Sequence, residues 1–126
     1  MQVTSKVVIN QRKINELIEA AAISLEQTAE ALHTEVQQAQ VVPRDTGNLQ
    51  NEAFFVDASQ CNTGVATLVH AAPYARRLYF HPEYNFQTHE NPNAKGGWFE
   101  DWLPGGSKED FCSDTFAKLY RRNAGL

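Results

Sequence analysis

The side chains with the chemistry to hold a metal ion gather in one stretch of ten residues, where His81, Glu83, His89 and Glu90 occur, with Asp101 further along. Zinc sites use histidine and carboxylate ligands of these types. An ion bound by His81, Glu83 and His89 would make the chain a small metal-dependent hydrolase. Their spacing, however, matches no helix-borne or knuckle pattern, and histidines beside acids are common in loops. The metal site therefore stays an alternative, and we expect no cofactor.

The two cysteines, Cys61 and Cys112, are the candidate nucleophiles. A thiol becomes a catalytic nucleophile when a histidine meets it in space. Cys61 falls in a predicted hairpin turn and Cys112 on the buried face of the predicted last helix, which favours small buried or incidental thiols. The chain also lacks the C-x-x-C, G-x-S-x-G, P-loop and H-E-x-x-H motifs of redox, hydrolase, nucleotide and metalloprotease sites. The usual sequence signals for these chemistries are therefore missing.

Arginine pairs are the other groups with a recognisable chemistry. Arg76–Arg77 and Arg121–Arg122 could meet phosphates or acidic partners, and Arg44–Asp45 is either a contact point or a turn with its own ion pair. Aromatic residues near these arginines would suit a single-stranded nucleic-acid binder, namely Tyr74, Tyr79, Phe80 and Tyr120. Arginine with aromatics is also typical of protein interfaces, where these residues dominate the binding energy. We therefore favour a protein partner and keep nucleic-acid binding as an alternative.

Composition limits the class of protein further. The 126 residues fit one domain, 1–126, and 42% hydrophobic with 21% charged residues is typical of folded globular chains. The 11 basic and 15 acidic side chains give a net charge of −4, which counts against binding nucleic acid or anionic membranes. Two cysteines, no apolar leader and no apolar run of about 20 residues predict a soluble protein that stays in the reducing compartment where it is made.

The first element that must position these groups is a long N-terminal helix. Val7–Ile9 predicts a short strand, and Asn10 follows as a candidate cap for a helix beginning near Gln11. Apolar residues then recur at helical spacing, with no Gly or Pro until Pro43. The predicted apolar stripe comprises Ile14, Leu17, Ile18, Ala21, Leu25, Ala29, Leu32, Val36 and Ala39.

The length of this helix leads to a prediction of its own. About 30 residues make a rod of ~45 Å, whereas a compact globule of this chain length is about 35 Å across. The helix must then break or project beyond its domain, and a projecting amphipathic helix needs a second copy or another partner to cover it. Ile23 points away from the predicted stripe, either as a lone exposed isoleucine or as a small sign of such a contact.

Two short strands follow the helix. The turn residues of Val42–Leu49 end the helical pattern, because Pro43 disfavours helix at the residue before it. Ala53–Ser59 and Val65–Ala71 predict strands rich in β-branched and aromatic residues, joined by a turn at Cys61–Gly64. The spacing indicates a hairpin.

The remainder of the chain predicts a short helix, a long loop and a final helix. Tyr74–Phe80 predicts the short helix, which begins after Pro73 and ends before Pro82. Residues 81–106 are dense in Asn, Pro and Gly yet carry interleaved aromatics, which favours an ordered loop packed on its own domain or on a neighbour. Ser107–Asp110 resembles a capping box that opens the last helix.

Several stretches of the chain together resemble a known family. VPRDTGNL at residues 42–49 is similar to the Pro-x-x-Thr-Gly-x-Leu signature of small neck proteins of tailed phages. PYARRLYFHPEYNF at residues 73–86 is more distinctive and resembles the minor capsid proteins of phages and prophages of Gram-positive bacteria. Shorter matches are NPNA at 91–94, GWF at 97–99 and YRR at 120–122. The likeness covers residues 42–126 and extends to the preceding helix only in general character, and Glu52 departs from the small polar residue expected there.

The resemblance implies an α+β fold, in which a long N-terminal helix packs on a small antiparallel β-sheet, with a short middle helix, an aromatic-rich loop and a C-terminal helix. It implies structural work in the virion, because such proteins are similar to the head–tail connector and tail-completion components that form rings between portal and tail. No catalytic residues come with this family, so the resemblance implies a protein that is not an enzyme. The implied partners are further copies of the chain and the neighbouring neck proteins, on the portal or adaptor side and on the tail terminator or tail tube side. The implied location is the virion neck, after synthesis in the host bacterial cytoplasm.

A closed ring requires two different adhesive faces on every copy. We expect the aromatic loop Tyr84–Trp102 to form one face, and Arg76–Arg77 with the Pro43–Leu49 turn to form the other. The predicted interface residues are Arg44, Asp45, Arg76, Arg77, Tyr84, Phe86, Trp98, Phe99 and Trp102. An acidic or neutral pore lining, which the net charge of −4 suits, would let phage DNA pass without specific binding.

Overall fold

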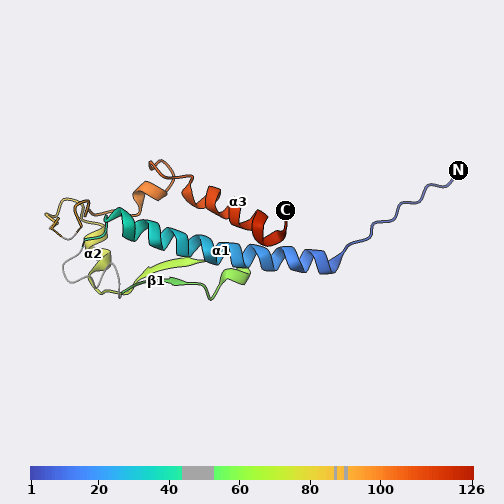
Figure 1. Ribbon diagram of the computed structural model, residues 1–126, viewed down its shortest axis with the longest axis horizontal. Helices are drawn as coiled ribbons and strands as arrows, with labels where there is room; N and C mark the ends of the chain where they lie inside the picture. The colour runs from blue at the N-terminus through green and yellow to red at the C-terminus, as the bar shows by residue number, and fades with distance from the viewer. Residues whose placement is uncertain (44–52, 87, 90) are drawn as a thin grey trace.

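The computed structural model describes residues 1–43, 53–86, 88, 89 and 91–126 and has an α+β fold, as predicted. The longest helix runs along the molecule, with a β-hairpin on one side and the C-terminal helix on the other (Figure 1). In chain order the elements are α1 (Gln11–Ala39), β1 (Phe54–Asp57), the 3-10 turn η2 (Cys61–Thr63), β2 (Thr67–His70), α2 (Ala75–Tyr79), the 3-10 turn η3 (Glu100–Trp102) and α3 (Phe111–Ala124). The helix α2 lies at the end of the molecule opposite the N-terminal segment.

Local signals set both ends of α1. The Asn10 side chain accepts a hydrogen bond from the backbone N–H of Lys13 (3.1 Å), which confirms the predicted cap. The helix continues for 29 residues, or about 43 Å at 1.5 Å per residue. It ends where Gln40 adopts a left-handed conformation (φ 56°) and donates its N–H to the Gln37 carbonyl. The helix that the sequence predicts is therefore present almost residue for residue.

The strand predicted at Val7–Ile9 is wrong. Residues 1–9 contain neither helix nor strand, and they run away from the rest of the molecule as an extended segment (Figure 1). β-branched residues favour an extended backbone, but a strand also needs a neighbouring strand to accept and donate its hydrogen bonds. Among the residues described, β1 and β2 pair with each other and leave no such partner beside Val7–Ile9.

The predicted hairpin is present with shorter strands. β1 and β2 pair antiparallel, with Phe54 opposite His70 and Asp57 opposite Thr67. The alternation of a strand places Phe54 in the core and Phe55 in solvent. After β1 the Asp57 carboxylate accepts the Ser59 N–H (2.9 Å), a local turn that ends the strand earlier than predicted.

The capping box predicted at Ser107–Asp110 is wrong, because α3 begins only at Phe111. The N–H of Lys108 donates to the Asp101 carbonyl (2.7 Å), and the Glu109 carboxylate accepts the N–H of Gly105 (2.8 Å). These residues therefore close the preceding turn instead of capping the helix. Asp110 occupies the cap position without a side-chain hydrogen bond to the helix.

The hydrophobic core lies at the C-terminal end of α1. Its buried members come from the end of α1, the hairpin, α2 and the aromatic loop: Val36, Val41, Val42, Phe54, Ala72, Ala75, Trp98 and Trp102. Trp98 and Phe54 are its largest fully buried side chains, and His33 adds a contact between its Nε2 and the Phe54 carbonyl oxygen (3.0 Å). The loop that the sequence marks as irregular thus contributes two large residues, Trp98 and Trp102, to the core.

The other half of α1 packs differently from the prediction. Ile14 and Ile18, which belong to the predicted apolar stripe, are exposed. The buried line on this half is made of small and polar residues spaced four apart, Ala20, Ser24 and Thr28, and α3 packs beside it. α3 has no fully buried residue of its own. The apolar stripe is therefore covered only toward its C-terminal end.

Candidate interaction surfaces

The aromatic loop divides into a buried and an accessible part. Trp98 is 1% exposed, donates its indole N–H to His70 Nε2 (3.0 Å) and stands edge-on to the rings of His70 and Tyr79. Trp102 is also buried, and the Lys108 ammonium lies 4.9 Å from its ring centre. The sequence analysis predicts Trp98 and Trp102 as interface residues, and this is wrong. Both lie in the core of this chain, where their large rings stabilise the fold.

Two glycines let Trp98 reach the core. A Cβ atom on Gly96 would lie 2.7 Å from the Cα of Pro82, so only glycine fits this close approach of two backbones. Gly97 has a φ of +57° and donates its N–H to the Tyr79 carbonyl (2.8 Å). The Gly-Gly pair before a Trp-Phe pair is the sequence signal for this arrangement, and it was available without the structure.

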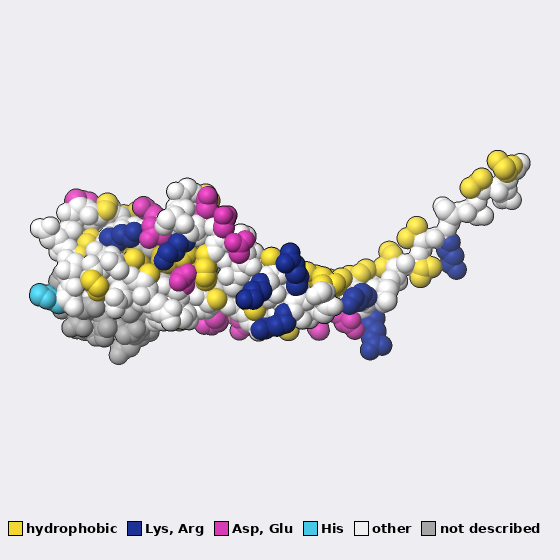
Figure 2. All heavy atoms as spheres, turned by 45° about the horizontal axis from the view of Figure 1, so that its top comes forward, with side chains coloured by type: hydrophobic (Ala, Val, Ile, Leu, Met, Phe, Trp, Pro, Cys, Tyr) yellow, Lys and Arg dark blue, Asp and Glu magenta, His cyan; other side chains and the backbone are white. Residues whose placement is uncertain are grey.

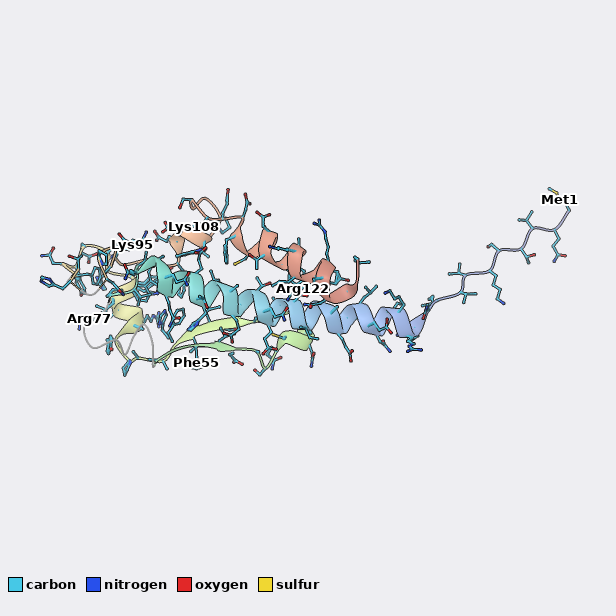
Figure 3. The ribbon with its side chains drawn as sticks, viewed as in Figure 1. Met1, Phe55, Arg77, Lys95, Lys108 and Arg122 are labelled. Carbon is cyan, nitrogen blue, oxygen red and sulfur yellow. The ribbon has the colours of Figure 1, made fainter. Side chains whose placement is uncertain are left out.

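Arg76 and Arg77 lie exposed on α2, as their predicted contact role requires. Figure 3 labels Arg77 near the end of the molecule opposite Met1. The Arg77 Nε donates to the hydroxyl of Tyr84 (3.4 Å), and this hydrogen bond raises the pKa of Arg77. The Tyr84 ring is half-buried and stacks on the imidazole of His81, with 4.7 Å between ring centres. These residues form one polar and aromatic surface.

The predicted metal ligands are only partly brought together. His81 Nδ1 lies 2.7 Å from Glu83 Oε1, and this hydrogen bond lowers the pKa of Glu83. His89 is exposed, and Glu90 lies outside the described residues. Within the part of the chain that the structure describes, no three histidine, cysteine, aspartate or glutamate side chains are grouped as a metal site would need. The pair His81–Glu83 is therefore the full extent of the site seen there.

Neither thiol has the environment of a nucleophile. Cys61 is buried where η2 packs against α1, and burial raises the pKa of its thiol, with further contributions from Glu26 and Asp57. Cys112 is partly buried on α3, and burial raises its thiol pKa as well. Because the thiolate is the reactive form, a raised pKa makes both groups less reactive near neutral pH.

An apolar groove lies beside α2. It has a volume of about 260 Å³, and its walls are largely aromatic. Its lining residues are His70, Ala75, Arg76, Tyr79, Phe80, Trp98 and Phe99. Phe80 is 67% exposed at this groove although its ring is large and apolar. The sequence shows Phe80 as the last residue of a predicted helix and as an aromatic near arginines but does not show the groove, because the groove forms only when β2, α2 and the Trp98–Phe99 segment meet.

The opposite end of the molecule presents a second apolar surface, which we call the N-terminal arm and define as residues 1–9. Val7, Val8 and Ile9 are 85%, 78% and 66% exposed. Figure 2 shows hydrophobic side chains along this extended arm. The first turns of α1, with Ile14 and Ile18 exposed, continue this surface. Of the two predicted alternatives, a break in the helix or a projection beyond the domain, the structure shows the second, because α1 is unbroken and its first residues are exposed.

Two further predicted contact residues, Arg44 and Asp45, lie outside the described residues. Of the remaining candidates, Phe86 is partly buried with its ring centre 6.4 Å from that of Tyr84, and Phe99 is partly buried in the wall of the groove. The accessible part of the predicted interface is therefore Arg76, Arg77, Tyr84, Phe86 and Phe99.

Comparisons with known proteins give no relative. No protein-family model matches the chain, and searches of the curated proteins and of the solved structures find no match. Among the described residues, none of the helices combines the length and the apolar character needed to cross a membrane.

Proposed function

We propose that this chain is a non-enzymatic structural subunit of the neck of a tailed phage or prophage, a head–tail connector or tail-completion component that assembles into a ring. The observation that carries the proposal is the presence of two unlike apolar surfaces at opposite ends of the molecule, the groove beside α2 and the N-terminal arm. A ring forms when one face of each copy meets a different face of the next. A chain with two unlike adhesive ends has the property that such an assembly needs.

The resemblance to minor capsid proteins selects this type of ring. The most distinctive matching stretch, residues 73–86, includes all of α2 and supplies four of the groove residues. Residues 97–99, another matching stretch, supply two more through Trp98 and Phe99. The resemblance is therefore concentrated at one of the two surfaces.

The proposed partners are other copies of the chain and the neck proteins on its portal and tail sides. Arginine and aromatic side chains dominate protein interfaces energetically, and Arg76, Arg77 and Tyr84 supply these types on an accessible surface. The net charge of −4 suits a ring through which phage DNA passes without specific binding.

The test is assembly with the portal and tail proteins encoded by the same phage or prophage. We expect light scattering to give a defined oligomer for the chain alone or in the mixture, and electron microscopy to show it as a ring at the head–tail junction. A chain that stays monomeric and ignores both sets of partners would overturn the proposal.

A matched pair of variants locates the contact with these partners. Arg77→Glu reverses a charge on the proposed surface, and Lys118→Glu makes the same change in net charge at an exposed position on α3. We expect the first to reduce assembly into virions and the second to leave it near the wild-type level, with both variants folded. Wild-type virion yield from Arg77→Glu would remove Arg77 from the interface.

A further inference from the structure

The N-terminal arm has the properties of a segment that binds elsewhere. Its residues Val7–Ile9 form an uninterrupted β-branched run, and all are exposed. Among the described residues, no backbone hydrogen bond joins residues 1–9 to the rest of the chain. An extended segment with apolar side chains and open backbone groups is the form in which peptides are recognised by grooves and sheet edges.

The groove beside α2 suits apolar side chains of such a segment. Its volume of about 260 Å³ lies just below the roughly 300–1,000 Å³ of sites for small organic ligands. Its walls carry the rings of Tyr79, Phe80 and Phe99, and the Trp98 indole N–H is already bonded to His70. These walls offer contact area for valine or isoleucine side chains.

The arm cannot reach the groove of its own copy. Val7 is four residues from Gln11, so the chain between them spans at most about 14 Å. From Gln11 to Val36, which packs in the same core as Ala75 and Trp98 of the groove, α1 extends about 38 Å. Figure 3 shows this separation, with Met1 and Arg77 labelled near opposite ends of the molecule. Only a second copy can bring Val7–Ile9 to the groove.

We propose that Val7–Ile9 of one copy docks in the groove lined by Ala75, Tyr79, Phe80 and Phe99 of the next copy. This contact is head-to-tail, so it can repeat from copy to copy and close into a ring. The inference rests on the proposed self-assembly and names the contact that produces it. It also explains why an apolar arm and an exposed Phe80 occur at opposite ends of one chain.

Two complementary variants test the contact. A variant lacking residues 1–9 keeps the groove and the Asn10 cap but has no arm, and Phe80→Asp keeps the arm but places a charge at the groove. Each variant alone is expected to be monomeric in light scattering at concentrations where the wild type associates. Their mixture contains one intact arm and one intact groove per pair, so we expect a complex of two chains that grows no further.

Matched variants define the size of the effect. Val8→Asp is expected to weaken the association about tenfold or more, because one buried aliphatic side chain contributes at least that factor. Thr4→Asp in the arm and Val65→Asp in the hairpin turn, both at exposed positions, should leave it nearly unchanged. Circular dichroism of every variant checks that the fold is retained.

The outcomes separate this inference from the proposed function. Association that survives both arm deletion and Phe80→Asp overturns the docking, as does a mixture that stays monomeric. If Ile18→Asp abolishes association while arm deletion does not, the exposed face of α1 is the contact and the inference is wrong. Each of these results leaves ring formation with portal and tail proteins to be decided by its own assembly experiment.

Discussion

The two halves of α1 belong to one uninterrupted helix but are covered in opposite ways. Around Val36 the helix meets large apolar side chains, among them Phe54 and Trp98, which are almost completely buried. Around Ser24 it meets α3 through small and polar residues, with the Asn123 amide donating to Ser24 Oγ (3.0 Å) and to Gln27 Oε1 (2.8 Å). Before Leu17 every residue of the helix is exposed.

This difference shows where the chain obtains its stability and where it has apolar surface left over. Apolar burial is the main favourable term in folding and grows with the area removed from water. The C-terminal half of α1 supplies most of that burial, because large rings pack there. The N-terminal half leaves Ile14, Ile18 and the arm in solvent, so its apolar groups are free for contacts between molecules.

The largest expected effect is at the centre of the core. Trp98→Ala should lower the free energy of unfolding by about 3–5 kcal/mol, the usual cost of removing a large buried ring. Denaturant unfolding followed by circular dichroism measures it. The control is Phe80→Ala, which removes an exposed ring at the C-terminal end of α2 and has an expected change below about 1 kcal/mol. Equal decreases in the free energy of unfolding for the two variants would contradict the distinction between a buried Trp98 and an exposed Phe80.

A buried amide ties the aromatic loop to the end of α1. The Asn91 side chain is 1% exposed and donates to the Val42 carbonyl oxygen (2.7 Å). Asn91→Ala leaves that buried carbonyl without its donor and should cost about 1–3 kcal/mol. Denaturant unfolding checks the value, and Asn93→Ala removes a more exposed bond to the Ala39 carbonyl for comparison. A larger decrease in the free energy of unfolding for Asn93→Ala than for Asn91→Ala would contradict the expectation that the more deeply buried hydrogen bond contributes more.

The contact between α1 and α3 should be weaker than the core. Asn123→Ala removes two hydrogen bonds at this contact and should cost about 1 kcal/mol, since each partly exposed bond contributes little net free energy. We expect hydrogen exchange to quicken in α3 and to stay unchanged near Val36, because local opening depends on local contacts. Uniform acceleration along both helices would show that the two halves of α1 unfold as one unit.

The smallest effect concerns the exposed pair His81–Glu83 beside α2. The hydrogen bond from His81 lowers the pKa of Glu83 below its usual 4.5 in the folded state. The contribution of the pair to stability is therefore complete above the unfolded pKa and is lost as the pH falls through the folded pKa. An NMR titration should show the Glu83 carboxyl titrating below 4.5 and returning toward that value in His81→Ala. An unchanged titration in His81→Ala would rule out this bond as the cause.

Several features were predictable because neighbouring residues determine them. The Asn10 cap, the long apolar period of α1, the hairpin and the short helix α2 follow from propensity, turn chemistry and spacing. The capping box at Ser107–Asp110 failed because Lys108 and Glu109 hydrogen-bond back to Asp101 and Gly105 and so belong to the preceding turn, and the helix begins only at Phe111. The strand at Val7–Ile9 failed because no second strand lies beside it among the residues described.

The sequence by itself determined the length of α1 and the order in which α1, the hairpin, α2 and α3 follow one another, but it predicted a strand at Val7–Ile9 where the structure has an extended arm. Only the tertiary structure decided which apolar groups are covered: Trp98 and Trp102 are buried while Phe80 and Ile18 are exposed. The physical reason is that the preference of a residue for helix, strand or turn depends on neighbours a few residues away. Its burial depends instead on which distant segments of the chain pack against the helix. In this chain the hairpin, α2 and the aromatic loop pack against the C-terminal half of α1, and the N-terminal end of the helix projects into solvent.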